Sequence, residues 1–198
     1  ELDITGNNEF TQVNQNLTWF TLAKGQLFFP FAIPTLPPAR PVPISASAEL
    51  AIAVDNILYN AVNNELYVSN SAALVVLNAD TLEVIESLPV AGAVGTMAVS
   101  SDGARLYVAY KNRSEIQEII VATRALGSAF NLGRDTSARD LFAEDIEVDP
   151  ADPQRLAVSL FRKDVSPRHG GVAIFQNGVR LPNSTQDHTG SNTIAFDS

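Results

Sequence analysis

The stretch MAVSSDGARLYVAY, residues 97–110, decides the fold because it has the pattern of two β-strands joined by a tight turn. Apolar residues alternate with small or polar ones on both sides of the Ser-Asp-Gly sequence at 101–103, which is typical turn chemistry. Similar patterns occur on both sides, as ILYNAVNNELYVSN at 57–70 and IEVDPADPQRLAVSL at 146–160. The sequence therefore predicts a repeated antiparallel hairpin.

The hairpin recurs with a period of 40 to 50 residues. Tyr59 aligns with Val99 and Val148, at steps of 40 and 49 residues. A fourth match, TIAFDS at 193–198, aligns with TMAVSS at 96–101. A fixed period of this length is typical of repeat architectures, and about four strands per period is the content of one propeller blade.

Further strand-like runs lie between the hairpins, at 73–90, 115–133 and 171–183. We therefore predict an all-β protein made of β-propeller blades, each of four antiparallel strands. The blades are expected at about 52–94, 95–143 and 144–190, and the first strand of a further blade at 191–198. A β-sandwich also has short strands, but it does not repeat a strand–turn–strand pattern at this period.

A single blade cannot bury both of its faces, so neighbouring blades must stack and a closed ring must protect the sheet edges. The residues expected in the core are Leu66, Val68, Leu74, Val76, Val99, Leu106, Val108, Ile146, Val148, Val158, Val172 and Ile174.

Residues 1–50 form an aromatic and proline-rich segment that does not share the repeat. Six of the eleven prolines fall in 30–43, and such a run favours extended polyproline II geometry over a central strand. We interpret the segment as a stiff linker or a cover for a sheet edge. Alternatively, the runs at 9–22, 26–33 and 42–50 supply three strands that complete the blade begun at 191–198, which gives a closed four-bladed ring.

Composition excludes several kinds of function. The 198 residues carry a net charge of −9 without a basic stripe, so a nucleic-acid partner is not expected. Cysteine is absent, which excludes disulfides, thiolate catalysis and cysteine-ligated metals. No apolar run approaches the length of a membrane span. Because the chain opens at Glu1 without methionine, we expect a processed form or a piece of a longer polypeptide.

A few side chains have the chemistry of metal ligands. His169 and His188 fall in the same repeat, near Arg168 and Asp187, but two histidines nineteen residues apart are more typical of loop residues that bond the backbone. Calcium prefers oxygen ligands from loops. Three residues with side-chain oxygens lie where the first strand of a blade would begin, beside the central channel. These are Glu144, Asp145 and Asn192.

The rest of the acidic run, Glu147, Asp149 and Asp152, matches no calcium loop, and turn-forming aspartate is the favoured interpretation. No Gly-x-Ser-x-Gly elbow and no phosphate-cradling loop occurs. We therefore assign no catalytic or cofactor-binding residue, and calcium is the one cofactor left open.

The phrases LYVSNSAALVVLNADTLEVIESLPVAG at 66–92 and GTMAVSSDGARLYVAY at 95–110 resemble the YVTN-type propeller repeat of bacterial and archaeal surface proteins and of related periplasmic propellers. The resemblance implies a ring of seven blades. It also implies an exported protein, extracellular, periplasmic or at the cell surface, without an active site of its own. On this basis we expect a scaffold or interaction module that contacts proteins or self-assembles. The alternatives are a lactonase-like or quinoprotein-like propeller enzyme with a metal or cofactor in its central channel, and an accessory subunit of a redox enzyme.

Overall fold

The computed structural model describes residues 17–18, 31–32, 54–70, 73–189 and 192–197. The chain divides into two compact units, residues 1–47 and 48–198. In the first unit, β1 (Leu17–Thr18) pairs antiparallel with β2 (Phe31–Ala32). The other residues of the predicted N-terminal segment lie outside the described residues, so its role as a linker or as the source of three blade strands stays a prediction.

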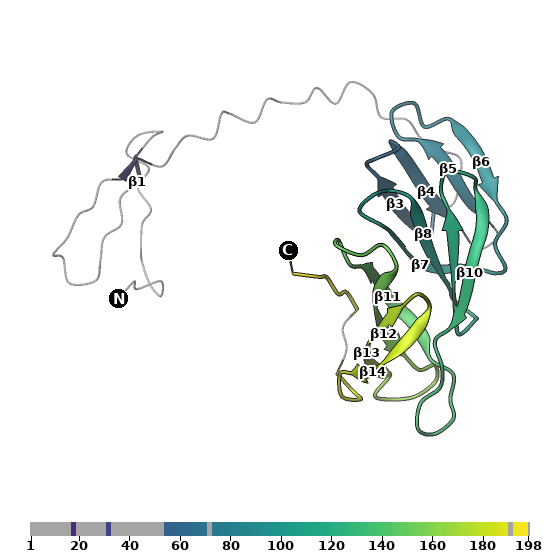
Figure 1. The fold of residues 1–198 in the computed structure, drawn as a ribbon, viewed down its shortest axis with the longest axis vertical. Coiled ribbons are helices and arrows are strands. Elements are labelled where there is room, and N and C mark those ends of the chain that lie inside the picture. The colour runs from purple at the N-terminus through teal and green to yellow at the C-terminus, as the bar shows by residue number, and fades with distance from the viewer. Residues whose placement is uncertain (1–16, 19–30, 33–53, 71–72, 190–191, 198) are drawn as a thin grey trace. The chain divides into compact units, whose positions relative to one another are not determined.

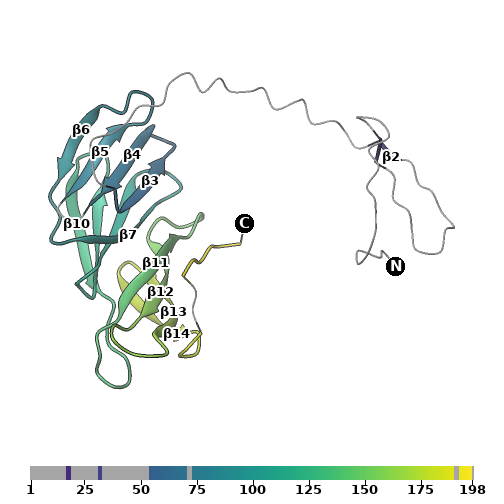
Figure 2. The same cartoon turned by 180° about the vertical axis from the view of Figure 1, so that it is seen from behind.

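The second unit holds three four-stranded antiparallel sheets (Figures 1 and 2). Sheet 1 contains β3 (Asn56–Asn60), β4 (Glu65–Ser69), β5 (Leu74–Asn78) and β6 (Val84–Leu88). Sheet 2 contains β7 (Val94–Val99), β8 (Arg105–Tyr110), β9 (Glu115–Ile120) and β10 (Ala125–Asn131). Sheet 3 contains β11 (Phe142–Val148), β12 (Arg155–Phe161), β13 (His169–Gln176) and β14 (Val179–Ser184). In each sheet the strands lie in chain order, which confirms the predicted four-stranded antiparallel blades.

The strand registers are equivalent in the three sheets. Tyr59, Val99 and Val148, which align in the sequence, each pair with the leucine at the same position of the second strand. These leucines are Leu66, Leu106 and Leu156. The repeat seen in the sequence is therefore a repeat of backbone pairing as well.

The sheets stack in sequence, β3 of sheet 1 against β7 of sheet 2, and β7 and β8 against β11 of sheet 3. Strand β8 is buried on both faces, because side chains alternate along a strand. Leu106, Val108 and Tyr110 belong to the core between sheets 1 and 2, whereas Tyr107 and Ala109 belong to the core between sheets 2 and 3.

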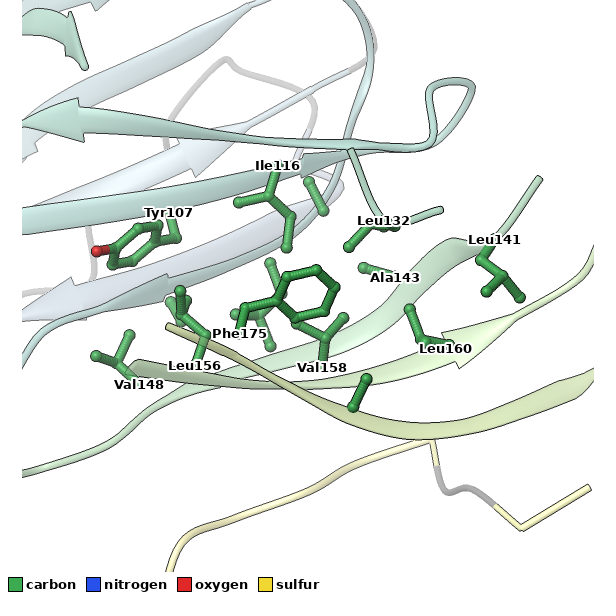
Figure 3. Packing of buried hydrophobic residues seen from close by; sticks show 14 residues of the cluster. Tyr107, Ile116, Leu132, Leu141, Ala143, Val148, Leu156, Val158, Leu160 and Phe175 are labelled. Carbon is green, nitrogen blue, oxygen red and sulfur yellow. The ribbon is translucent and has the colours of Figure 1, made fainter. Parts of the chain in front are cut away.

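Phe175 lies at the centre of the core between sheets 2 and 3. Figure 3 shows its ring between Ile116 and Leu132 of sheet 2 and Val158 of its own sheet. The Phe175 side chain is fully buried, and its ring centroid lies 5.4 Å from that of Phe130. This aromatic contact joins β13 to β10 across the stacked sheets.

Eight of the twelve predicted core residues are buried, and the remaining four are half-buried. Three of these four, Leu66, Val172 and Ile174, lie on the faces of sheets 1 and 3 that point away from sheet 2. The prediction assumed a neighbour on both sides of every blade. The described residues supply one neighbour each for sheets 1 and 3.

The predicted strand at 191–198 carries no strand assignment over its described residues, 192–197. A strand is defined by a ladder with a neighbour, and no described strand forms one with this segment. The segment is instead tied to β11, because the Ile194 backbone N–H donates to Asp145 Oδ2 at 2.9 Å. Within the described ranges there is no helix that is long and apolar enough to cross a membrane.

Candidate functional site at the leading end of the sheets

We call the end at which the first strand of each sheet begins the leading end. In sheet 2 the start of β7 at Val94 pairs with the end of β8 at Tyr110, and in sheet 3 the start of β11 at Phe142 pairs with the end of β12 at Phe161. The β6–β7, β8–β9, β10–β11 and β12–β13 loops therefore all lie at this end. Loops at one end of a rigid scaffold are where binding residues concentrate.

All five metal-ligand candidates from the sequence lie at or beside the leading end. Glu144 and Asp145 are in the first half of β11, His169 begins β13, and His188 and Asn192 follow β14. The side chains of Glu144, Asp145 and His188 contact other protein groups, whereas Asn192 is exposed. His169 accepts a hydrogen bond through its carbonyl, and its buried Nδ1 has no hydrogen-bond partner. Across the described ranges, no three histidine, aspartate or glutamate side chains gather as metal ligands would.

Asp145 links successive first-strand positions. Its Oδ1 lies 3.5 Å from the Thr96 Oγ1 of sheet 2, and its Oδ2 accepts the Ile194 N–H at 2.9 Å. Thr96, Asp145 and Ile194 are equivalent or nearly equivalent positions of the repeat, each 49 residues apart. The carboxylate therefore acts as a tie between neighbouring repeats.

Glu144 forms an ion pair with Arg168, a residue of the β12–β13 loop. The Arg168 guanidinium lies 4.8 Å from the centroid of the Phe161 ring. The Lys163 ammonium lies 4.3 Å from the centroid of Phe142, and the two rings are 5.7 Å apart. We call these four residues, Phe142, Phe161, Lys163 and Arg168, the cation–aromatic cluster.

The cluster borders a hollow of about 260 Å³ at the leading end. Its lining comes from both sheets 2 and 3, and comprises Gly95, Lys111, Ala143, Glu144, Phe161 and Arg168. The hollow therefore offers two cations, one carboxylate and one aromatic ring to a contacting group.

Loop-to-loop contacts fix the three sheets relative to each other at this end. The Lys163 ammonium donates to the Lys111 carbonyl and to Asn112 Oδ1, the latter at 3.0 Å. Lys111 in turn pairs with Asp55 of sheet 1 at 2.9 Å. Because each contact joins neighbouring sheets, the leading-end loops form one continuous surface.

The sequence interpretation missed Arg162, which follows β12. Its side chain is only 6% exposed and donates two hydrogen bonds to Asp187, to Oδ1 at 2.6 Å and to Oδ2 at 3.0 Å. Arg162 also donates to the His169 carbonyl, contacts Asp135 Oδ2 at 3.4 Å and lies 3.5 Å from His188 Nδ1. The carbonyl of His169 and the ring of His188 thus both contact a buried arginine, which fixes the segment after β14 on sheet 3.

Arg162 dominates the electrostatics of this cluster. Its hydrogen bonds to Asp187 hold the pKa of that carboxyl below its usual range, and the same contacts raise the pKa of the guanidinium. Arg168, which the sequence places near the histidines together with Asp187, pairs with Glu144 and not with Asp187. One turn separates the two arginines, and sequence alone does not show which of them points inward.

The lowered pKa of Asp187 predicts a pH dependence of stability. An aspartate titrates near about 3.9 in the unfolded chain, so its ion pair stabilises the fold fully above that pH. The stabilisation is then lost as the pH falls through the lower folded-state pKa. We expect Asp187→Asn to reduce the slope of unfolding free energy against pH in the acid range.

Denaturant titrations at a series of acid pH values measure that slope. Asp197→Asn, which changes an exposed aspartate of the same terminal segment, is the matched control and should leave the slope as in the parent protein. An unchanged slope in Asp187→Asn would contradict the assigned ion pair.

Of the other residues of the acidic run, Asp149 and Asp152 stabilise turns, and Glu147 lies within β11. Asp149 Oδ1 accepts the Ala151 N–H, and Asp152 Oδ1 accepts the Gln154 N–H, both at 2.9 Å. These are the bonds that make aspartate favourable in turns. Burial and the nearby Asp145 raise the pKa of Glu147.

At the opposite end, two tyrosines of the second strands link neighbouring sheets. The Tyr107 hydroxyl donates to the Pro153 carbonyl of sheet 3 at 2.8 Å, and burial raises the pKa of Tyr107 to about 12. The Tyr67 hydroxyl donates to Glu65 at 2.9 Å and accepts from Arg124 of sheet 2 at 3.2 Å. Both tyrosines occupy the middle position of a Leu-Tyr-Val sequence.

Solved structures resemble this chain in fold. Hydrazine synthase of Kuenenia stuttgartiensis matches 66% of this chain and 35% of its own, at 17% identity and a TM-score of 0.54. The β-propeller domain of Myceliophteria thermophila Cps50 (Swd1) matches 71% of this chain and 41% of its own, at 12% identity and a TM-score of 0.54. The chain thus spans less than half of either structure. No family model and no curated protein matches it. At these identities the likeness establishes the β-propeller fold.

Proposed function

We propose that this chain is a non-enzymatic module of an exported β-propeller, which contacts proteins through the leading end of its sheets. The observation that carries the proposal is the cation–aromatic cluster beside the hollow. Arginine and aromatic side chains are enriched at protein interfaces, because they combine a large apolar area with directional polar contacts. Here two such rings lie at the leading ends of β11 and β12, and their cations lie on the β12–β13 loop, which the rigid β scaffold holds in place.

Charge pairing at the same surface also supports a protein partner. Arg168 and Lys111 each have a carboxylate partner, whereas Lys163 donates to a carbonyl and an amide oxygen. These two hydrogen bonds hold the Lys163 ammonium in place. Neither of them is to a carboxylate that would neutralise its charge. A partner that places a carboxylate here would gain a charge-assisted hydrogen bond.

We further propose that the repeats are of the YVTN type. The two Leu-Tyr-Val sequences that carry the resemblance place Tyr67 and Tyr107 at sheet-to-sheet contacts. In sheet 3 the equivalent residue is Ala157, so the third repeat departs from the pattern. Export to the periplasm, the cell surface or the medium belongs to this proposal.

Charge reversal of the cluster tests the proposed partner surface. We expect the double variant Lys163→Glu with Arg168→Glu, made in the full-length protein in its native host, to lose co-isolated protein partners by at least about tenfold. The physical reason is that Glu144 and the new glutamates place like charges at the contact. Quantitative mass spectrometry after mild cross-linking provides the measurement.

Arg155→Glu is the matched control, because Arg155 is a similarly exposed cation at the opposite end of sheet 3. Its recovery of partners should equal that of the parent protein. If the double variant keeps its partners while melting at the parent temperature, the leading end is not the contact surface and the proposal fails.

A further inference from the structure

The outer strand of sheet 2, β10, has a free edge, because β9 is its one neighbour among the described strands. Residues 125–129 and 131 of this strand are exposed. The edge of a sheet presents unpaired backbone N–H and C=O groups, with which a further strand can pair. The direction of these groups decides whether β10 can accept such a strand.

The hydrogen bonds to β9 show which backbone groups of β10 point outward. Directly after β10, the Leu132 N–H donates to the Ser114 carbonyl at 3.0 Å. In an antiparallel ladder, residues that exchange such bonds alternate with residues that do not. The register continues unbroken from Leu132 through Asn131 and Phe130 to Ala129. Phe130 therefore bonds to β9, whereas the N–H and C=O groups of Ala129 and Asn131 point away from it.

A β-bulge precedes these residues, and buried side chains of β9 hold it in place. The Gln117 amide donates to the Gly127 carbonyl at 3.1 Å and to the Ser128 carbonyl at 3.3 Å. The Ser128 N–H donates to Glu118 Oε2 at 3.1 Å. The edge after the bulge is thus fixed before a partner arrives, and binding to a preorganised group costs less conformational entropy.

The outer strands of the other two sheets carry residues that obstruct pairing, and β10 carries none. Strand β14 contains Pro182 and Arg180, and β6 contains Glu86. Prolines and charges on an edge are common means by which proteins prevent a further strand from pairing. Strand β10 has the sequence ALGSAFN, without a proline or a charge. Of the three outer strands, it is therefore the one best suited to accept a partner strand.

A polar hollow of about 80 Å³ lies beside β10, between sheets 2 and 3. Glu118, Ser128 and Phe130 line it from sheet 2, and Gln154 and Asn177 line it from sheet 3. The last two belong to the turns that follow β11 and β13, so the hollow lies at the end opposite the leading end. A strand added to the edge of β10 would direct every second side chain toward this face of sheet 2.

The hollow has the space and the chemistry for a short hydroxyl side chain. Glu118 is the one charged residue among those that line it, and Arg105 pairs with the Glu118 carboxylate. Because Arg105 already compensates that charge, a neutral donor suits the hollow better than a second cation. A carboxylate has about four acceptor positions, so an O–H group can be added to the bonds from Arg105 and Ser128. The Glu118 side chain is 9% exposed, and such a bond is stronger away from water.

We propose that the edge of β10 binds an extended segment of a partner protein as an antiparallel fifth strand of sheet 2. The segment pairs with Ala129 and Asn131 and places a threonine or serine hydroxyl in the hollow. In this mode of recognition the backbone bonds supply affinity, and a pocket for alternate side chains supplies specificity. The contact is separate from the leading end and does not depend on the function proposed for that surface.

A synthetic peptide tests the proposal on the full-length protein. The peptide is fluorescein-labelled Lys-Thr-Val-Thr-Val-Thr-Val-Thr-Lys, and fluorescence anisotropy measures its binding. With the threonines toward sheet 3, the valines lie opposite Ala129 and Asn131 and donate their N–H groups to β10. N-methylation of the valines should weaken binding at least about tenfold, because it removes these donors. N-methylation of the threonines is the matched control and should leave binding unchanged. No saturable binding, or equal effects of the two methylations, would overturn the proposal.

Substitution of Ala129 tests the same bonds from the side of the protein. Proline removes the outward N–H of this residue and leaves the ladder to β9 intact. We expect Ala129→Pro to bind the peptide at least about tenfold more weakly, and Ala129→Val, which keeps the N–H, to bind it as the parent protein does. Melting temperatures verify folding, and the methylated peptides decide the matter if Ala129→Pro is unfolded. Equal binding by the two folded variants would show that β10 is not the site.

Two further measurements test the hollow and the state of the edge. A peptide with valine in place of every threonine keeps the side-chain shape but lacks the hydroxyl, and should bind about tenfold more weakly. Equal binding of this peptide would overturn the role assigned to the hollow. In the protein without peptide, the N–H groups of Ala129 and Asn131 should exchange with solvent much faster than that of Phe130. Slow exchange at both would show that another segment or a second copy already pairs with β10, which also overturns the proposal.

Discussion

Replacing Phe175 with alanine is expected to lower the free energy of unfolding by about 4 kcal/mol. The side chain is fully buried at the centre of the core between sheets 2 and 3, and its ring contacts Phe130 across the interface. Truncation removes the transfer free energy of the ring and leaves a cavity that two rigid sheets cannot collapse to fill. For a domain of this size the melting temperature should fall by about 10 °C.

Chemical denaturation of Phe175→Ala measures this loss. Val179→Ala, at the first residue of the neighbouring β14, is the matched control, because Val179 is 66% exposed and its truncation should cost less than about 0.5 kcal/mol. A loss of less than about 1 kcal/mol in Phe175→Ala would mean that sheets 2 and 3 do not pack as described.

Replacing Arg162 with alanine should lower the free energy of unfolding by about 2 kcal/mol, because a buried guanidinium loses its charge-assisted hydrogen bonds while its main partner, Asp187, is half exposed and stays hydrated. The Asp135 side chain is 8% exposed beside Arg162, and Asp187 loses both of its bonds to the guanidinium. The segment after β14 should also become susceptible to proteolysis, since Arg162 fixes it on sheet 3.

Arg134→Ala provides the control for Arg162→Ala. Arg134 also pairs with an aspartate, Asp140 at 2.8 Å, but the two side chains are 66% and 51% exposed. Exposed pairs contribute little, so this change should cost less than about 0.5 kcal/mol. Equal effects of the two substitutions would show that Arg162 is not buried among its partners as described.

The fold could be predicted from the sequence because it rests on local, repeated patterns. The turn residues at 101–103 and the Leu-Tyr-Val strands fix hairpins, and their period fixes the four-stranded blade. Those features depend on neighbouring residues in the chain. The structure accordingly places Tyr59, Val99 and Val148 at equivalent positions of their sheets.

The leading-end surface could be predicted only in part, because it is assembled from residues far apart in the sequence. Nothing near Lys163 indicates that its ammonium reaches the Lys111 carbonyl, or that Arg162 and not Arg168 pairs with Asp187. An arginine directly after an apolar strand was the only signal for Arg162.

The decisive measurement is an experimental structure of the protein bound to a co-isolated protein partner, at a resolution that shows side chains. We predict that the partner covers the hollow at the leading end and places a carboxylate within hydrogen-bond distance of the Lys163 ammonium. A structure in which the partner contacts another face of the protein and leaves Lys163 and Arg168 in solvent would contradict the proposed function.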